Sequence, residues 1–237
     1  MESLVQLLVI LLFIVIFHLG KYPEKLVPSV NLGREYAEAI ILFGAVLFIY
    51  WSKTFYPSLF TWGVYGTYYL VIGLCLLFIM EKIVRRRGIS SVGFKLPINR
   101  KALMIFTGAI ALYLIVGILR HVLYGIEFLY INEYFISGVI LGPFYEETVF
   151  RGLIQTRFEA GSGTVKSWIF SGLLFGFYHY WAHFLIVGQT LTIPSLTQLI
   201  WVTLFGMLLG VIFAKTRSLL PPFLLHAINN FFAYMPW

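Results

Sequence analysis

The stretch Tyr134-Phe-Ile-Ser-Gly-Val-Ile-Leu-Gly-Pro-Phe-Tyr-Glu-Glu-Thr-Val-Phe-Arg151 is apolar enough to span a membrane, yet it carries two adjacent glutamates, Glu146 and Glu147. On insertion scales, an acidic residue at the centre of a bilayer costs roughly 2.5–3.5 kcal/mol. Only ten of the 237 residues are acidic. Two of them at this depth indicate a functional site, and the partners of these glutamates decide what the site does.

The composition of the chain is that of an integral membrane protein. It is 60% hydrophobic and 11% charged, with a mean hydropathy of +0.88, whereas a soluble domain has roughly 25% charged residues. We expect an all-α, polytopic fold with about eight transmembrane helices, because most apolar segments approach the ~20 residues that cross a bilayer. The expected spans are 3–19, 36–52, 60–80, 102–123, 134–157, 166–187, 196–214 and 218–236.

The placement of Lys and Arg predicts the orientation of the chain. Residues 82–101 hold seven basic residues and are expected to form a solvated cytoplasmic loop, which puts 14 of the 17 basic residues on the cytoplasmic side. The net charge of +7 is then a topology signal, so membrane lipids are expected partners and nucleic acid is not. We expect a single membrane domain over 1–237, in which the loop separates three helices within 1–81 from a five-helix catalytic part over 102–237.

Polar side chains from three C-terminal spans are expected at one depth. At 1.5 Å per residue from the cytoplasmic end of its own span, Glu146 lies roughly 16 Å deep and His179 roughly 20 Å deep. His226 and Asn230 lie roughly 14 and 20 Å deep by the same count. Any one of them alone would be interpreted as a contact between helices. Four such residues at one depth are improbable as helix contacts alone, and they predict a shared polar layer.

The spacing within the first of these spans separates the two glutamates. Glu147 and Arg151 are four residues apart and share a helix face, so a local ion pair is expected. Glu146 points about 100° away and is left to face another helix. Pro143 removes one backbone donor, which frees a carbonyl and favours a kink.

The chemistry that suits these side chains is hydrolysis of an amide bond. A carboxylate beside an imidazole can activate water as a general base, and a second imidazole with an amide can donate to an oxyanion. Other intramembrane hydrolases are excluded by motif, since the chain has no aspartate, no His-Glu-x-x-His and no Gly-x-Ser-x-Gly. A non-catalytic scaffold or immunity protein, and a proton path, stay open as alternatives.

At these residues the chain resembles the CPBP family of membrane proteins, the CAAX proteases and bacteriocin-processing proteins also called Abi-type. Glu146-Glu-Thr-Val-Phe-Arg151 resembles the Glu-Glu-x-x-x-Arg of that family. Phe175-Gly-Phe-Tyr-His179 resembles Phe-x-x-x-His, and His226-Ala-Ile-Asn-Asn230 resembles His-x-x-x-Asn. The resemblance covers roughly residues 134–234, and its strength lies in three ordered motifs in separate spans.

The resemblance implies a role for each matched residue. Glu146 and His179 would activate water, and His226 and Asn230 would hold the oxyanion. Glu147 and Arg151 would orient the site. The family mechanism implied is metal-free with no cofactor, although a zinc ion held by Glu146 or Glu147 with both histidines, and by His183 as a further ligand, has acceptable ligand types. We expect no metal, because Asn230 suits an oxyanion donor better than zinc.

The sequence therefore predicts an intramembrane endopeptidase in a bacterial cell membrane. Its expected partner is a peptide or lipid-modified protein substrate. The resemblance implies that the activity serves CAAX-type processing, maturation of a peptide signal, or bacteriocin self-immunity. The small size and the lack of appended domains favour bacterial peptide processing.

Overall fold

The computed structural model describes residues 2–26, 31–52, 62–97, 100, 133–182, 188, 190 and 192–233, with scattered residues between 103 and 122. Within these residues all the regular structure is helical, which confirms the expected all-α class. The N-terminal helices are α1 (Glu2–His18), α2 (Leu32–Ser52), α3 (Trp62–Phe78), the π-helix η2 (Ile79–Val84) and the 3-10 helix η3 (Ile89–Val92). The C-terminal helices are α5 (Glu133–Ile136), η4 (Ser137–Leu141), α6 (Gly142–Glu147), η5 (Thr148–Gln155), α7 (Thr156–Ser162), α8 (Thr164–Tyr180), α9 (Ile193–Thr216) and α10 (Leu220–Ala233).

Seven of the eight expected spans coincide with described helical segments. The remaining one, 102–123, falls mostly outside the described residues. Two described helical segments, Thr67–Val84 and Ser195–Thr216, are long and apolar enough to cross a membrane by length and composition. The number of crossings and the orientation of the chain stay predictions.

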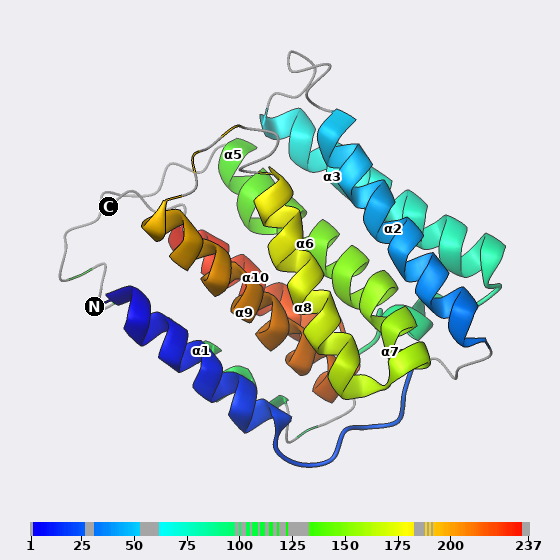
Figure 1. The fold of residues 1–237 in the computed structure, drawn as a ribbon, viewed down its shortest axis with the longest axis horizontal. Helices are drawn as coiled ribbons and strands as arrows, with labels where there is room; N and C mark the ends of the chain where they lie inside the picture. The colour runs from blue at the N-terminus through cyan, green and yellow to red at the C-terminus, as the bar shows by residue number, and fades with distance from the viewer. Residues whose placement is uncertain are drawn as a thin grey trace.

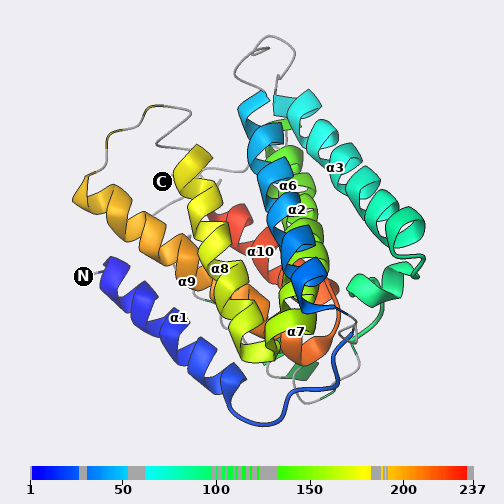
Figure 2. The same cartoon turned by 45° about the vertical axis from the view of Figure 1, so that its right-hand side comes forward.

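The helical run from α5 to α7 lies in the middle of the molecule. Helices α2 and α3 lie on one side of this run, whereas α8, α9, α10 and α1 lie on the other (Figures 1 and 2). One cluster of buried apolar residues joins α2 and α3 to the central run and α8. A second cluster joins α1 to α8, α9 and α10. The N-terminal helices thus pack directly on the C-terminal part.

Large apolar side chains also cover much of the outer surface. On α2, Ala39, Leu42 and Val46 face the core, while Ile40, Ile41 and Phe48 are more than 60% exposed. Soluble proteins rarely expose such continuous apolar area, but a lipid-facing surface requires it. The outward face of this helix therefore fits contact with hydrocarbon.

Buried ion pairs join α2 to residues beyond α3. The Arg85 guanidinium donates to both carboxylate oxygens of Glu35, at 2.8 and 2.9 Å, and to Glu38 at 2.8 Å. Arg157 on α7 bonds Glu38 at 3.1 Å and Glu81 at 2.7 Å. The expectation of a solvated loop over 82–101 is wrong for Arg85, whose side chain is 5% exposed, because α2 presents two carboxylates at its level.

Helices α8 and α9 approach closely at two glycines. A Cβ built on Gly172 would lie 2.7 Å from the backbone nitrogen of Met207, and one on Gly176 would lie 2.9 Å from the Cβ of Thr203. Small residues at such crossings let helix backbones approach each other in membranes. This contact fixes the level of His179, which follows Gly176 by one turn, against α9.

The α8–α9 contact predicts the effect of one methyl group. Gly172→Ala should destabilise the folded protein by about 1–3 kcal/mol, because α9 backbone would have to move. Gly44→Ala on α2 is the control, since nothing lies within 4 Å of its built Cβ. Thermal unfolding in detergent measures both, and equal melting temperatures for the two variants would contradict the packing.

Candidate functional site

The two glutamates lie on a helix interrupted by π-helical turns. The run Glu133–Ser162 changes from π (η4) to α (α6) just before the glutamates and back to π (η5) just after them. At the first change, the Gly142 N–H bonds the Ser137 carbonyl five residues back. π-helical turns are rare in proteins, and those that do occur are often found at functional sites. Here they lie on both sides of Glu146 and Glu147.

Pro143 and Asn230 together explain the first of these changes. Pro143 has no N–H, so the next carbonyl after that of Ser137, the Gly138 carbonyl, has no donor in the π register. Asn230 Nδ2 on α10 donates to that Gly138 oxygen at 2.9 Å. We expected Pro143 to leave one backbone carbonyl without its helical donor. In the structure this is the Gly138 carbonyl, and a side chain from another helix bonds it. One amide proton of Asn230 is committed there, and the second remains for another acceptor.

Glu147 is the most enclosed acid of the site. Its Oε1 accepts a hydrogen bond of 2.9 Å from His226 Nδ1 on α10. Its Oε2 lies 3.1 Å from Arg151 Nε, so the expected ion pair between Glu147 and Arg151 is present. Glu147 is 1% and His226 is 4% exposed. A carboxylate this deeply buried needs both partners.

Arg151 connects the glutamate to two further helices. Its Nη2 donates to the Gly206 carbonyl of α9 at 2.9 Å. Its guanidinium carbon lies 4.7 Å from the ring centroid of Phe175 on α8, within the range of a cation–π contact. The side chain is fully buried. The central helical run, α8, α9 and α10 therefore meet at the Glu147–Arg151 pair.

Glu146 lies beside the same imidazole but is more open. Its Oε2 is 3.7 Å from His226 Nε2, and its side chain is 15% exposed. This separation is longer than a direct hydrogen bond, and a water molecule within reach of both groups could bridge them. His226 therefore faces one glutamate with each ring nitrogen.

His179 is held next to this imidazole through Phe175. His179 Nδ1 lies 2.9 Å from the Phe175 carbonyl, and because a carbonyl only accepts, Nδ1 carries the proton. The ring of Phe175 lies 4.6 Å from the His179 ring and 5.7 Å from the His226 ring, between centroids. Both imidazoles thus contact one aromatic side chain.

The structure brings the predicted residues into one neighbourhood and adds two groups, Phe175 and the Gly206 carbonyl, that the sequence did not assign to the site. Glu147 contacts His226 and Arg151 directly, and Glu146 lies 3.7 Å from His226. His179 and His226 both contact the Phe175 ring, and Asn230 bonds the Gly138 carbonyl of the helix that carries the glutamates. The predicted motifs include Phe175, but sequence reasoning gave it no role. The Gly206 carbonyl was missed, because a backbone acceptor on another helix leaves no sequence signal.

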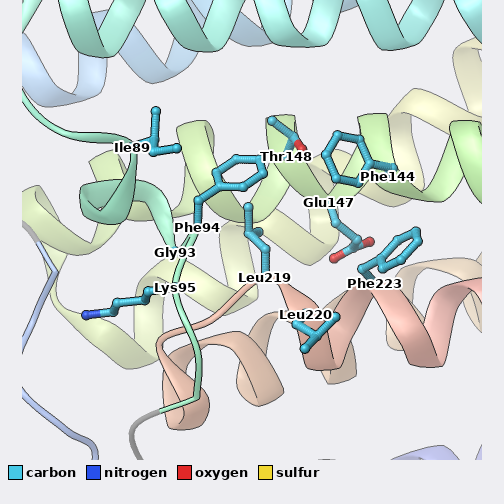
Figure 3. A pocket seen from close by; sticks show the side chains of 10 residues that line it. All are labelled: Ile89, Gly93, Phe94, Lys95, Phe144, Glu147, Thr148, Leu219, Leu220 and Phe223. Carbon is cyan, nitrogen blue, oxygen red and sulfur yellow. The ribbon is translucent and has the colours of Figure 1, made fainter.

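A cavity of about 380 Å³ reaches Glu147 from the side of the 89–95 segment. Figure 3 shows the side chains around it. Apolar residues dominate the wall and come from the 89–95 segment, α6, the turn between α9 and α10, and α10 itself: Ile89, Phe94, Phe144, Leu219, Leu220 and Phe223. Thr148 and Glu147 are its polar residues besides Lys95. The cavity was not expected from the sequence.

The described residues contain no group of three His, Cys, Asp or Glu side chains placed to hold a metal ion. His183, the further zinc ligand considered from the sequence, lies outside those residues. Among the described residues, His226 Nδ1 is hydrogen-bonded to Glu147, so this nitrogen is already occupied by a protein partner. Metal analysis of purified protein addresses zinc directly.

The buried Glu147–Arg151 pair predicts a large loss of stability on truncation. Glu147→Ala should lower the free energy of unfolding by about 3–5 kcal/mol, since Arg151 would stay buried without its counter-charge. Arg34→Ala breaks another Glu–Arg pair at the same four-residue spacing, but its side chain is 53% exposed, so the loss should stay within about 1 kcal/mol. Unfolding in detergent measures both, and a similar cost for the two would refute the assigned burial.

The Pro143–Gly138–Asn230 arrangement predicts coupling between two residues that do not bond each other. Asn230→Ala should cost about 1–3 kcal/mol, because it leaves the Gly138 carbonyl unsatisfied. In a Pro143→Ala background the restored N–H can bond this carbonyl, so the cost of Asn230→Ala should shrink. A double-mutant cycle on unfolding measures the difference, and additive costs would show that Pro143 does not free the carbonyl.

Comparison with known protein families gives a match over the C-terminal part of the chain. Residues 127–232 match the model of the family described as "Type II CAAX prenyl endopeptidase Rce1-like". No curated protein and no solved structure matches the chain. The match covers the residues that build the site, from α5 to α10. Over these residues, which make up somewhat less than half of the chain, the sequence is similar to the Rce1-like CAAX proteases, a membrane-embedded family of peptide hydrolases.

Proposed function

We propose that this protein is an intramembrane endopeptidase that hydrolyses a peptide bond with a water molecule activated by Glu146. The observation that carries the proposal is the position of His226 between two carboxylates, with Nδ1 on Glu147 and Nε2 3.7 Å from Glu146. Glu147 orients the His226 imidazole through this hydrogen bond. The other glutamate is partly exposed and available to a water molecule.

The two glutamates take different roles because their surroundings differ. Glu147 is held by Arg151 and His226 and is a positioning residue. Glu146 would accept a proton from water as the water oxygen forms a bond to the carbonyl carbon of the substrate. When the C–N bond then breaks, Glu146 would return that proton to the leaving amine. His179, whose neutral ring carries its lone pair on Nε2 when Nδ1 is protonated, would assist in orienting the water.

The oxyanion would be held from α10. A protonated His226 donates from both nitrogens, so Nε2 can donate to an oxyanion while Nδ1 stays on Glu147. The second amide proton of Asn230, one turn further along α10, supplies another donor. Two donors aimed at the developing charge are the usual requirement of an oxyanion hole. These groups need no metal ion, and we propose a metal-free reaction.

The substrate class follows from the family and the setting. The family name implies a prenylated protein or peptide that ends in a Cys-aliphatic-aliphatic-X sequence. The exposed apolar helix faces favour a substrate held at or in the membrane. CAAX-type processing is the first function to test, and maturation of an unmodified bacterial peptide is the second.

The decisive experiment compares site variants of the purified protein in detergent. Glu146→Gln and His179→Ala should each reduce cleavage of a farnesylated CAAX peptide by at least about 100-fold, the scale of a lost general base. The matched controls are Glu24→Gln and His18→Ala, because both residues are exposed and lie outside the site. Cleavage is measured by mass spectrometry, with a chelator added in a parallel reaction.

Equal cleavage by all the variants would end the proposal of an enzyme with this site. Loss of cleavage on chelation, with stoichiometric zinc in the purified protein, would replace the metal-free mechanism. If wild type cleaves no prenylated peptide, peptides that accumulate in cells carrying Glu146→Gln identify the substrate. A cellular function that survives Glu146→Gln and fails on Gly172→Ala would indicate a non-catalytic scaffold.

A further inference from the structure

The cavity beside Glu147 has a firmly built wall. The Leu219 N–H bonds the Gly93 carbonyl at 2.9 Å, and the Ser218 hydroxyl bonds the Lys95 carbonyl at 2.5 Å. Gly93 has a φ of +91°, which favours glycine, and its built Cβ would lie 2.6 Å from the ring of Phe213. The 89–95 segment is therefore fixed on the turn between α9 and α10.

Thr148 lines this apolar cavity and carries a buried hydroxyl. Thr148 is 1% exposed, and its Oγ1 has no hydrogen-bond partner among the residues the structure describes. A helical threonine ordinarily bonds the carbonyl three or four residues back. A buried hydroxyl without a partner costs about 1–3 kcal/mol, so a group that fills the cavity and bonds this oxygen would recover that cost.

From this arrangement we propose that the cavity is a subsite for a bulky apolar side chain of the peptide substrate, with the Thr148 hydroxyl bonded to the adjacent peptide group. The proposal rests on the proposed function for the identity of the substrate. Thr148 directly follows Glu147, and both residues line the cavity. A side chain in the cavity would therefore hold the peptide beside the carboxylate that orients His226.

The polar residues distinguish a peptide from a plain hydrocarbon chain. Hydrocarbon would fill the space among Phe94, Phe144 and Phe223 but would leave the Thr148 hydroxyl unbonded. A peptide carries an amide beside each apolar side chain, and the amide can donate to or accept from a hydroxyl. Ligand sites commonly combine apolar walls with a few polar groups in this way.

A cysteine-protection experiment tests the subsite without needing catalysis. Cys75 is the only cysteine, so Cys75→Ser gives a thiol-free background. Leu220→Cys then places a thiol on the cavity wall, and Leu224→Cys places one four residues along α10 outside it. Both positions are partly exposed in the native protein, at 44% and 37%. The probes are N-acetyl-phenylalanine methylamide and n-butylbenzene, which has no amide, and the measurement is the rate of maleimide labelling in detergent.

The amide probe should slow labelling of Leu220→Cys several-fold and leave Leu224→Cys unchanged, while n-butylbenzene should protect less. Thr148→Val should require about 3- to 10-fold more amide probe for the same protection, the factor expected for one hydrogen bond. It should not lower the melting temperature, because the native hydroxyl has no partner to lose among the described residues. A purely structural Thr148 would instead show a lower melting temperature and unchanged protection.

Other outcomes overturn the subsite. Equal protection of both cysteines would show partition of the probe into detergent. Equal protection by the two probes, unaffected by Thr148→Val, would make the cavity a site for hydrocarbon chains. The same measurements in a Glu146→Gln background separate this proposal from the enzymatic one, because protection there needs no cleavage. Protection with no loss of cleavage by Glu146→Gln would refute the mechanism and leave the subsite standing.

Discussion

The site depends on the buried carboxylate of Glu147, which binds two partners at once. It holds Arg151 on its own helix and His226 on α10. Arg151 in turn reaches the Gly206 carbonyl of α9 and the Phe175 ring of α8. A buried charge without partners costs several kcal/mol, so these helices cannot separate cheaply. The requirement to pair one charge thus places His226 beside Glu146, while His179 contacts the same Phe175 ring as His226.

Backbone irregularity contributes the other half of the geometry. Pro143 and the π turns of η4 and η5 change the helical register around Glu146 and Glu147. The carbonyl left over at Gly138 is bonded by Asn230. The same amide that could hold an oxyanion therefore also secures the helix that carries the glutamates. In such a site, structural and chemical roles are shared by the same side chains, and single substitutions will affect both.

Sequence reasoning predicted the helices, because hydropathy and residue spacing report directly on helical segments. The common depth of the polar residues in a membrane stays a prediction. Sequence reasoning could predict that Glu147 pairs with Arg151 from their spacing. It could not predict that Glu147 also bonds His226, since a contact 79 residues apart depends on how helices rotate. The cavity, the Gly206 carbonyl and the burial of Arg85 were missed for the same reason. Each depends on packing between segments that are distant in sequence.

Proton NMR of the His226 imidazole measures whether Glu147 orients this ring. In detergent-solubilised protein with ¹⁵N-labelled histidine, the His226 signals are assigned by their loss in His226→Gln. If Glu147 orients His226, Nδ1 is protonated and carries a downfield, slowly exchanging proton whose signal shifts markedly in Glu147→Gln. An unprotonated Nδ1, or a signal that Glu147→Gln leaves in place, would show that Glu147 does not orient this ring.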